Sequence, residues 1–351
     1  MNARWIAVLW LALAGPALSQ GFAGMGQDAD GFAMPRPEPR FVFPQDHGSH
    51  PDFRIEWWYL TANLKGEDGR DYGVQWTLFR NALAPGDANG WATPQIWMGH
   101  AGLTTQDRHF SAERFARGGI GTASVAADPF EAFIGDWTMA GPDLNDIVLT
   151  ARGAEFAYAL RARATGPFVR QGDKGYSVKS PEGQASYYYS QPFYEVSGEI
   201  TLPDGPITVT GTAWLDREWS SQPLASDQTG WDWFALNLPD GEKLMAFRLR
   251  HEDRPDFHSG TWIAADGTPN PFDPDDLVAT PLEWSDTEGG SVPTTWRLEI
   301  PGRGLDIVIT AINTQSWMRT AVAYWEGPVR FEGTHAGVGY LEMTGYDTAN
   351  P

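Results

Sequence analysis

The sequence contains no cysteine, and it has few basic side chains. The absence of cysteine excludes disulfides, cysteine-ligated zinc, iron–sulfur clusters and thiol nucleophiles. Only 25 lysines and arginines oppose 45 aspartates and glutamates, which gives a formal net charge of −20. This balance argues against nucleic acid as a partner and against docking on anionic lipid, since both need a basic surface. Beyond the N-terminus, no stretch approaches the length of a transmembrane helix.

Aromatic and turn-forming residues are abundant instead. The chain has 17 Trp, 18 Phe and 11 Tyr, together with 39 Gly and 26 Pro in 351 residues. Frequent glycine and proline favour many short strands and turns over long helices. The length is sufficient for one large domain or two ordinary ones.

The first residues have the pattern of a secretory signal. Arg4 precedes a short apolar run at 5–14, and residues 17–19 form a small-x-small cleavage site. We therefore expect a signal peptide at 1–19, an extended leader at 20–40, and a periplasmic or secreted mature chain. An uncleaved N-terminal anchor is the alternative.

The alternation of apolar residues predicts an all-β chain. Residues 54–64 and 71–80 read as a hairpin with Asp68-Gly69 at the tip of its turn. Further strands are expected at 97–104, 147–150, 156–163, 187–200 and 207–219, with a short helix possible at 111–116. Such strands, punctuated by Gly and Pro, suggest antiparallel barrels or sandwiches. A barrel of about eight strands can hold a small ligand inside.

The second half of the chain partly restates the first. Residues 231–238, followed by Asp240-Gly241, align with residues 57–64 and Asp68-Gly69, and 340–342 echo 214–216. We infer a duplicated unit, with domains at 41–222 and 223–351 and a joint at 224–229. The echo is short, so chance similarity competes with duplication.

One strand carries two carboxylates beside an indole. Period two along 207–219 places Trp214, Asp216 and Glu218 on one face. An inward carboxylate costs several kcal/mol unless it is paired or protonated. Something must offset that cost, either a structural ion pair or a function.

Four motifs resemble those of a known family. They are Glu56-Trp57-Trp58-Tyr59, Gly73-x-Gln75-Trp76-Thr-Leu-Phe-Arg80, Trp214-x-Asp216-Arg217-Glu218-Trp219 and Gly230-Trp231-Asp232-Trp233-Phe. With them the chain resembles the lipocalin-like secreted bacterial proteins of the AttH group, which are grouped with the carotenoid 1,2-hydratases (hydroxyneurosporene synthases). The resemblance implies two lipocalin-like antiparallel β-barrel domains in tandem.

The resemblance to the hydratases also implies an activity. That subgroup adds water, without a cofactor, to the terminal double bond of an acyclic isoprenoid. Its proposed acid is an aspartate in a Tyr-x-Asp context, and the matching residue here is Asp216, with Trp214 in the place of the tyrosine. The AttH-like subgroup is the closer match, and its members are often called hydrolases.

We therefore expect an aromatic-lined cavity that binds a small apolar or amphipathic ligand, an isoprenoid or lipid. Asp216 is the predicted acid, kept neutral by burial with Glu218 tuning it. No cofactor and no metal site are expected, because His47 and His50, flanked by Asp46 and Asp52, read as a solvated or capping loop. The predicted ligand-binding residues are Trp214, Trp219, Trp231, Trp233, Glu56, Trp58, Gln75 and His100.

Other functions stay open at this level. Asp216 and Glu218 could instead form a structural network with Arg217, Arg54 or Arg80. Carboxylates at i and i+2 lie about 6.6 Å apart, near the lower edge of the roughly 6.5–9.5 Å found in inverting glycosidases. A serine hydrolase is disfavoured because no Gly-x-Ser-x-Gly motif is present. A non-catalytic periplasmic lipid carrier, linked to a membrane transporter or to envelope maintenance, is the main rival, and the oligomeric state is undetermined.

Overall fold

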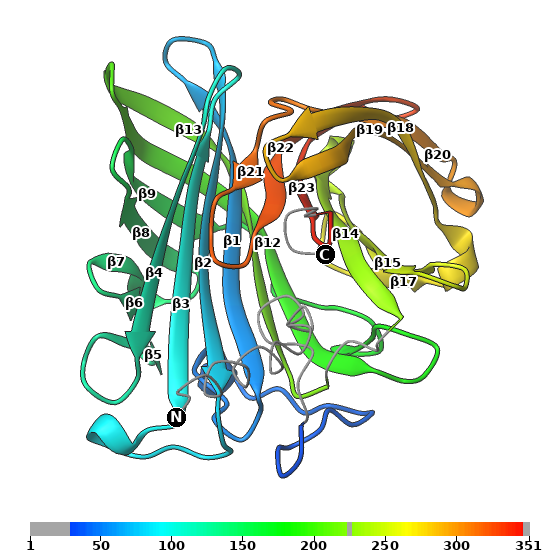
Figure 1. The fold of residues 1–351 in the computed structure, drawn as a ribbon. Coiled ribbons are helices and arrows are strands. Elements are labelled where there is room, and N and C mark those ends of the chain that lie inside the picture. The colour runs from blue at the N-terminus through cyan, green and yellow to red at the C-terminus, as the bar shows by residue number, and fades with distance from the viewer. Residues whose placement is uncertain (1–28, 223–226, 347–351) are drawn as a thin grey trace, which may run out of the picture.

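Two large antiparallel sheets make up the protein in the computed structural model (Figure 1). The structure describes residues 29–222 and 227–346. The predicted signal peptide, part of the leader and part of the predicted joint lie outside these residues. No helix in the described ranges is long and apolar enough to cross a membrane.

The first sheet contains thirteen strands in the order β4-β3-β2-β1-β13-β12-β9-β8-β7-β6-β5, and β10 and β11 also pair with β12. The strands are β1 (Ile55–Gly66), β2 (Asp71–Ala82), β3 (Gln95–Thr104), β4 (His109–Arg117), β5 (Ala123–Ala127), β6 (Phe130–Ile134), β7 (Trp137–Asp143), β8 (Asp146–Arg152), β9 (Ala157–Ala164), β10 (Val169–Arg170), β11 (Tyr176–Val178), β12 (Ala185–Leu202) and β13 (Gly205–Ser220).

The second sheet contains ten strands in the order β17-β16-β15-β14-β23-β22-β20-β19-β18, and β21 also pairs with β22. The strands are β14 (Gln228–Asn237), β15 (Lys243–His251), β16 (Phe257–Ile263), β17 (Pro269–Phe272), β18 (Val278–Thr287), β19 (Gly290–Ile300), β20 (Leu305–Ala311), β21 (Trp317–Met318), β22 (Tyr324–Gly333) and β23 (Gly337–Met343). The short 3-10 turns are η2 (Gln45–His47), η3 (Gly90–Ala92), η4 (Pro239–Gly241), η5 (Pro274–Asp276) and η6 (Pro301–Arg303).

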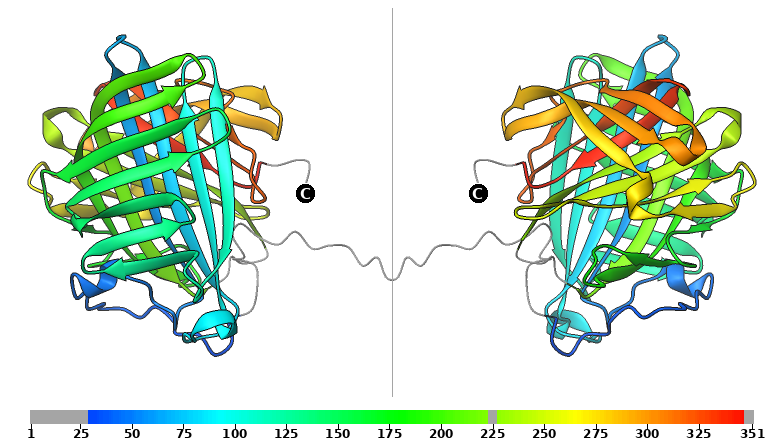
Figure 2. Two further views of the ribbon diagram at one scale, coloured as in Figure 1. Left: turned by 90° about the vertical axis from the view of Figure 1, so that its left-hand side faces the viewer. Right: turned by 90° about the vertical axis from the view of Figure 1, so that its right-hand side faces the viewer.

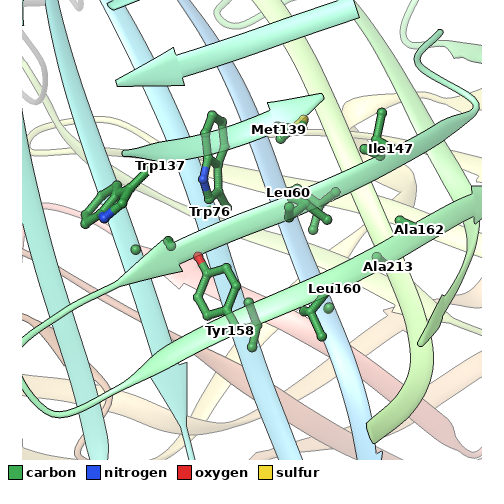
Figure 3. Close-up of a cluster of buried hydrophobic side chains, with 14 of the residues drawn as sticks. Leu60, Trp76, Trp137, Met139, Ile147, Tyr158, Leu160, Ala162 and Ala213 are labelled. Atoms are coloured by element: carbon green, nitrogen blue, oxygen red, sulfur yellow. The ribbon is translucent and has the colours of Figure 1, made fainter. Parts of the chain in front are cut away.

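Each sheet curls around its own apolar core, as the two side views show (Figure 2). The core of the first sheet is filled by side chains such as Leu60, Trp76, Trp137 and Tyr158, drawn in Figure 3. The second core is built around residues such as Trp296 and includes no residue of the first. The all-β prediction of two lipocalin-like barrels in tandem is confirmed.

The predicted hairpin forms as expected. β1 and β2 pair from Ile55–Asn81 to Lys65–Asp71, and Gly69 takes a φ of 79°, which glycine adopts without strain. The predicted helix at 111–116 is wrong, because β4 covers that segment and pairs with β3 along its whole length. Ala, Glu and Arg are among the best helix formers, but helix propensity is worth less than about 1 kcal/mol per residue, so sheet pairing overrides the local preference.

The strands of the first sheet that contact the second sheet differ from the others in how many of their residues are buried. In β9 buried and exposed residues alternate, as expected for a strand with one face in the core. From Ala213 to Ser220, by contrast, every residue of β13 is buried. The second sheet covers the outer face of these strands: β1 packs beside β23 (Figure 1), and Trp214 of β13 meets Trp233 of β14 edge to face. Both faces of these central strands are therefore covered by protein.

The two sheets repeat the pairing that the sequence echo suggested. Tyr59 of β1 lies opposite Asp216 of β13, and Trp233 of β14 lies opposite Glu342 of β23. Echoed residues thus occupy equivalent places in the two sheets. This register supports duplication, while the domain boundaries at 222 and 223 stay a prediction.

Candidate active site between the two sheets

A cavity of about 130 Å³ lies between the outer faces of the two sheets. Its walls come from β1, β12 and β13 on one side and from β14, β15 and β23 on the other. The sequence suggested a ligand site inside a barrel, whereas this cavity lies between the two barrels. The barrel interior of the first sheet is packed with side chains (Figure 3).

Asp216 reaches this cavity from β13, as period two predicted. Its Oδ2 accepts a hydrogen bond from the Tyr188 hydroxyl at 2.6 Å, and its Oδ1 accepts bonds from Ser190 Oγ and Trp214 Nε1, both at 2.6 Å. Burial raises the pKa of Asp216 to about 7, against these three hydrogen bonds, which favour the ionised form. Near neutral pH this carboxyl can therefore hold or release a proton.

Glu218 lies two residues further along the same wall. It forms an ion pair with Lys179 at 2.8 Å and accepts a hydrogen bond from Ser186. The Lys179 ammonium also stands 4.7 Å from the ring centres of Tyr188 and Phe247. The negative charge of Glu218 adds to the raised pKa of Asp216, while the catalytic roles predicted for both residues stay a prediction.

A second carboxyl of shifted pKa enters the cavity from the other sheet. Glu342 of β23 accepts a hydrogen bond from Trp231 Nε1 at 2.8 Å. Burial raises the pKa of Glu342 to about 7, and the charges of Asp216 and Glu218 add to that shift. Sequence reasoning missed Glu342 as a site residue, although the echo of 214–216 in 340–342 pointed to it.

Aromatic rings form most of the remaining wall. Trp57 and Tyr59 of β1 face Trp231 and Trp233 of β14 across the cavity. Tyr59 and Trp233 meet edge to face, with 5.3 Å between ring centres. An apolar cavity of roughly 150 Å³ can hold one benzene ring, so this cavity accommodates a small apolar group such as the end of an isoprenoid chain.

The comparison with known proteins agrees with this architecture. A model of the AttH-like family matches residues 34–346. The chain belongs to the AttH-like family. A solved structure of a putative AttH protein from Nitrosomonas europaea is 33% identical, with a TM-score of 0.81, and the match covers 90% of this chain and 100% of that one.

Two more distant structures share the fold of this AttH-like protein. Kievitone hydratase from Nectria haematococca is 15% identical with a TM-score of 0.67, and the match covers 86% of this chain and 92% of that one. CghA, solved with Sch210972, is 13% identical with a TM-score of 0.54, and the match covers 92% and 98%. At these identities the likeness shows the fold alone. No curated protein matches the sequence.

Three of the predicted ligand-binding residues of the AttH-like chain lie on the far face of the central strands. Glu56 is fully buried and pairs with Arg80 at 2.5 Å and with Arg217 at 3.2 Å. Trp58 lies under the Arg217 guanidinium at 3.9 Å, and Trp219 also packs in the core of the first sheet. Glu56 is thus the carboxylate of the structural arginine network, and Asp216 is not.

The histidines of the entry segment pack against the first sheet instead of facing solvent, and His50 joins the network of Glu56. His50 bonds to Glu56 at 3.0 Å and stacks on Trp219, with 3.9 Å between ring centres. His47 is buried and bonds to the Tyr189 hydroxyl at 2.7 Å. The sequence predicted a solvated or capping loop. The solvated alternative is wrong, because this segment packs against the end of the first sheet.

The last two predicted residues, Gln75 and His100, are buried outside the cavity. Both bond to the Tyr324 hydroxyl of the second sheet, at 3.2 Å and 3.0 Å. They belong to a separate polar cluster between the sheets. Of the predicted residues, the cavity brings together Asp216, Glu218, Trp231 and Trp233, with Trp214 behind Asp216.

Proposed function

We propose that this AttH-like protein is an enzyme of the hydratase type, which adds water to a carbon–carbon double bond of an isoprenoid or related lipid. The observation that carries the proposal is Asp216, a buried carboxyl with a pKa of about 7 in an aromatic-walled cavity. Protonation of an alkene needs a carboxylic acid that is neutral near pH 7. A structural carboxylate would instead face a cation, as Glu56 does.

The proposed reaction begins when the Asp216 O–H transfers its proton to the less substituted alkene carbon. A new C–H bond forms from the π electrons, and the neighbouring carbon becomes a carbocation. Trp57, Trp231 and Trp233 line the cavity, and their rings can stabilise positive charge through their quadrupoles. Because the walls are apolar, the cation meets few competing nucleophiles.

Water then attacks the carbocation, and a carboxylate accepts the proton that the water loses. Glu342 is suited to this step because it faces the same cavity and interacts with Asp216. Two coupled carboxyls with pKa values of about 7 tend to share one proton near neutral pH. One can then act as the acid and the other as the base.

The size of the cavity limits the substrate class. About 130 Å³ accommodates one end of an isoprenoid and not a whole carotenoid. The partly exposed Lys179, Gln184 and Gln222 form the side from which a longer chain would extend. Kievitone hydratase, which shares the fold, is by its name also a hydratase.

The second candidate is a non-catalytic lipid-binding protein of the periplasm, serving a membrane transporter or envelope maintenance. Three hydrogen-bond donors fix the Asp216 carboxyl, and a purely structural carboxyl would need the same support. In both cases we propose that the chain is secreted and that its ligand is apolar or amphipathic.

Two measurements separate these functions. Native mass spectrometry of protein purified from its own envelope identifies any bound lipid, and incubation with geraniol, farnesol and that lipid in ¹⁸O-water detects hydration by mass. We expect ¹⁸O in an alcohol product for the wild type and none for Asp216→Asn. The control is Asp146→Asn, at an ion pair with Arg161 on the surface. A folded Asp216→Asn protein with wild-type turnover would remove Asp216 from the mechanism, and a bound lipid without any turnover would favour the carrier.

A further inference from the structure

A second set of buried polar groups begins at the cavity wall and runs away from it. Tyr59 lines the cavity and interacts with Glu342. The Tyr59 hydroxyl donates to Glu326 Oε1 at 2.6 Å, across the contact between β1 and β22. Glu326 is buried, with 1% of its surface exposed, and it has no cationic partner among the ion pairs of the described residues. Burial raises the pKa of Glu326 well above its ordinary value, which favours the protonated carboxyl.

The same carboxyl leads on to a tyrosine and a histidine. Glu326 also interacts with the Tyr324 hydroxyl, two residues earlier on β22. Tyr324 lies 3.0 Å from His100 Nδ1, and His100 Nε2 lies 3.1 Å from Glu113 Oε1. His100 is fully buried, whereas the Glu113 side chain is 19% exposed. The set therefore ends at the surface of the first sheet.

The donors in this set can all point the same way. Burial lowers the pKa of His100, so the ring is neutral and carries one N–H. A carboxylate at Glu113 accepts that N–H from Nε2, which leaves Nδ1 to accept from Tyr324. Glu326 accepts from Tyr59 at Oε1, and its Oε2 has no other hydrogen-bond partner among the described residues, so Oε2 can carry the proton that passes towards Tyr324. With these assignments a proton can move outward from Tyr59 to Glu113 through groups that each can both accept and donate.

We propose that Tyr59, Glu326, Tyr324, His100 and Glu113 form a proton relay that connects Glu342 in the cavity with solvent. The role of this relay in catalysis rests on the proposed hydratase function. Each hydration leaves Asp216 ionised and Glu342 protonated while the product still fills the cavity. The relay passes one proton from Glu342 outward to Glu113 and then to water, and Asp216 takes one proton from solvent after the product leaves. No net proton is consumed.

The relay also explains why four polar side chains, Tyr59, Glu326, Tyr324 and His100, are buried where the two sheets meet. Polar groups in a protein interior cost free energy unless each is hydrogen-bonded, and apolar residues could fill the same contact at lower cost. Their order, from a cavity carboxyl to a partly exposed one, is what proton transfer to solvent requires.

The relay can be tested without a substrate, by infrared spectroscopy of the protonated Glu326 carboxyl. Its C=O band is the one lost in Glu326→Gln, and the rate at which it shifts after transfer into D₂O measures proton exchange. Tyr59→Phe removes the route through the cavity. In that background, we expect Tyr324→Phe to slow the exchange about tenfold or more, because exchange then needs local opening of the structure.

The matched control is Tyr194→Phe in the same background. Tyr194 is equally buried, and its hydroxyl bonds to the Leu144 carbonyl, outside the relay. Glu113→Gln interrupts the relay at its partly exposed end, where a substitution disturbs folding least. This variant should also slow the exchange. Unchanged exchange in both relay variants, with unchanged melting temperatures, would overturn the relay. Because no turnover is measured, the relay can fail while Asp216 catalysis stands, and the reverse also holds.

Discussion

Replacement of Asp216 by Asn should make the protein more stable at alkaline pH and less stable at acidic pH. The pKa of Asp216 rises from an ordinary value of 3.8 to about 7 on folding. That difference corresponds to about 4 kcal/mol of unfavourable free energy when the carboxyl is ionised in the folded protein. Because the folded state binds the proton more tightly, the cost is absent near pH 4, grows as pH rises towards 7, and is complete above it.

Asparagine keeps the size of the side chain and removes the charge. Its amide nitrogen cannot accept a hydrogen bond, so one of the three donors from Tyr188, Ser190 and Trp214 must turn or lose its partner. That loss costs about 1 kcal/mol at every pH. Asp216→Asn should therefore be about 1 kcal/mol less stable than wild type near pH 4 and about 3 kcal/mol more stable near pH 8, to the order of magnitude.

Urea unfolding at several pH values between these limits measures the difference directly. The decisive quantity is the change of sign between acid and alkaline pH. Asp146→Asn serves as control, because that carboxyl is on the surface with arginine partners and its pKa is lowered instead of raised. A stability difference between Asp216→Asn and wild type that stays constant over this range would refute the raised pKa, and with it the argument for a neutral acid.

Three further results are expected. Glu56→Gln should lose about 3–5 kcal/mol at neutral pH in urea unfolding, because it leaves two buried arginines without their carboxylate; a loss below 1 kcal/mol would contradict this. In the hydration assay the pH–rate profile should be a bell centred near 7, and Glu342→Gln should remove its acidic limb and lower kcat about 10²-fold or more; an intact acidic limb would exclude Glu342 as the base. Gly73→Ala should destabilise the contact between the sheets by about 1–3 kcal/mol in thermal unfolding, since a Cβ there would lie 2.6 Å from Pro328, and an unchanged melting temperature would show that the contact adjusts freely.

Much of the fold was predictable because its signals are local. Asp68-Gly69 requires a tight turn, and alternating apolar residues require strands with one face inward. The helix prediction at 111–116 failed because the partners of these residues in β3 lie 9 to 19 residues away in sequence, where local propensity carries no information. The burial of both faces of β13 likewise depends on contact with the second sheet, which the alternation of residues along one strand cannot predict.

The site was predictable only in part. The face shared by Asp216 and Glu218 followed from period two and holds in the structure. The same rule set Glu56 and Trp58 on one face, but it could not say which face borders the cavity. Tyr188, which donates to Asp216 from the neighbouring strand, carries no sequence signal beyond its residue type.

By itself the sequence determined the strand pattern, the duplicated motif and the pairing of an acid with aromatic residues, because these depend on spacing along the chain. Only the tertiary structure decided that the cavity lies between the sheets, that Glu342 faces it with Asp216, and that Glu56 pairs with buried arginines. The reason is physical: the pKa of a carboxyl depends on burial and on the charges around it, and both are set by segments far apart in sequence.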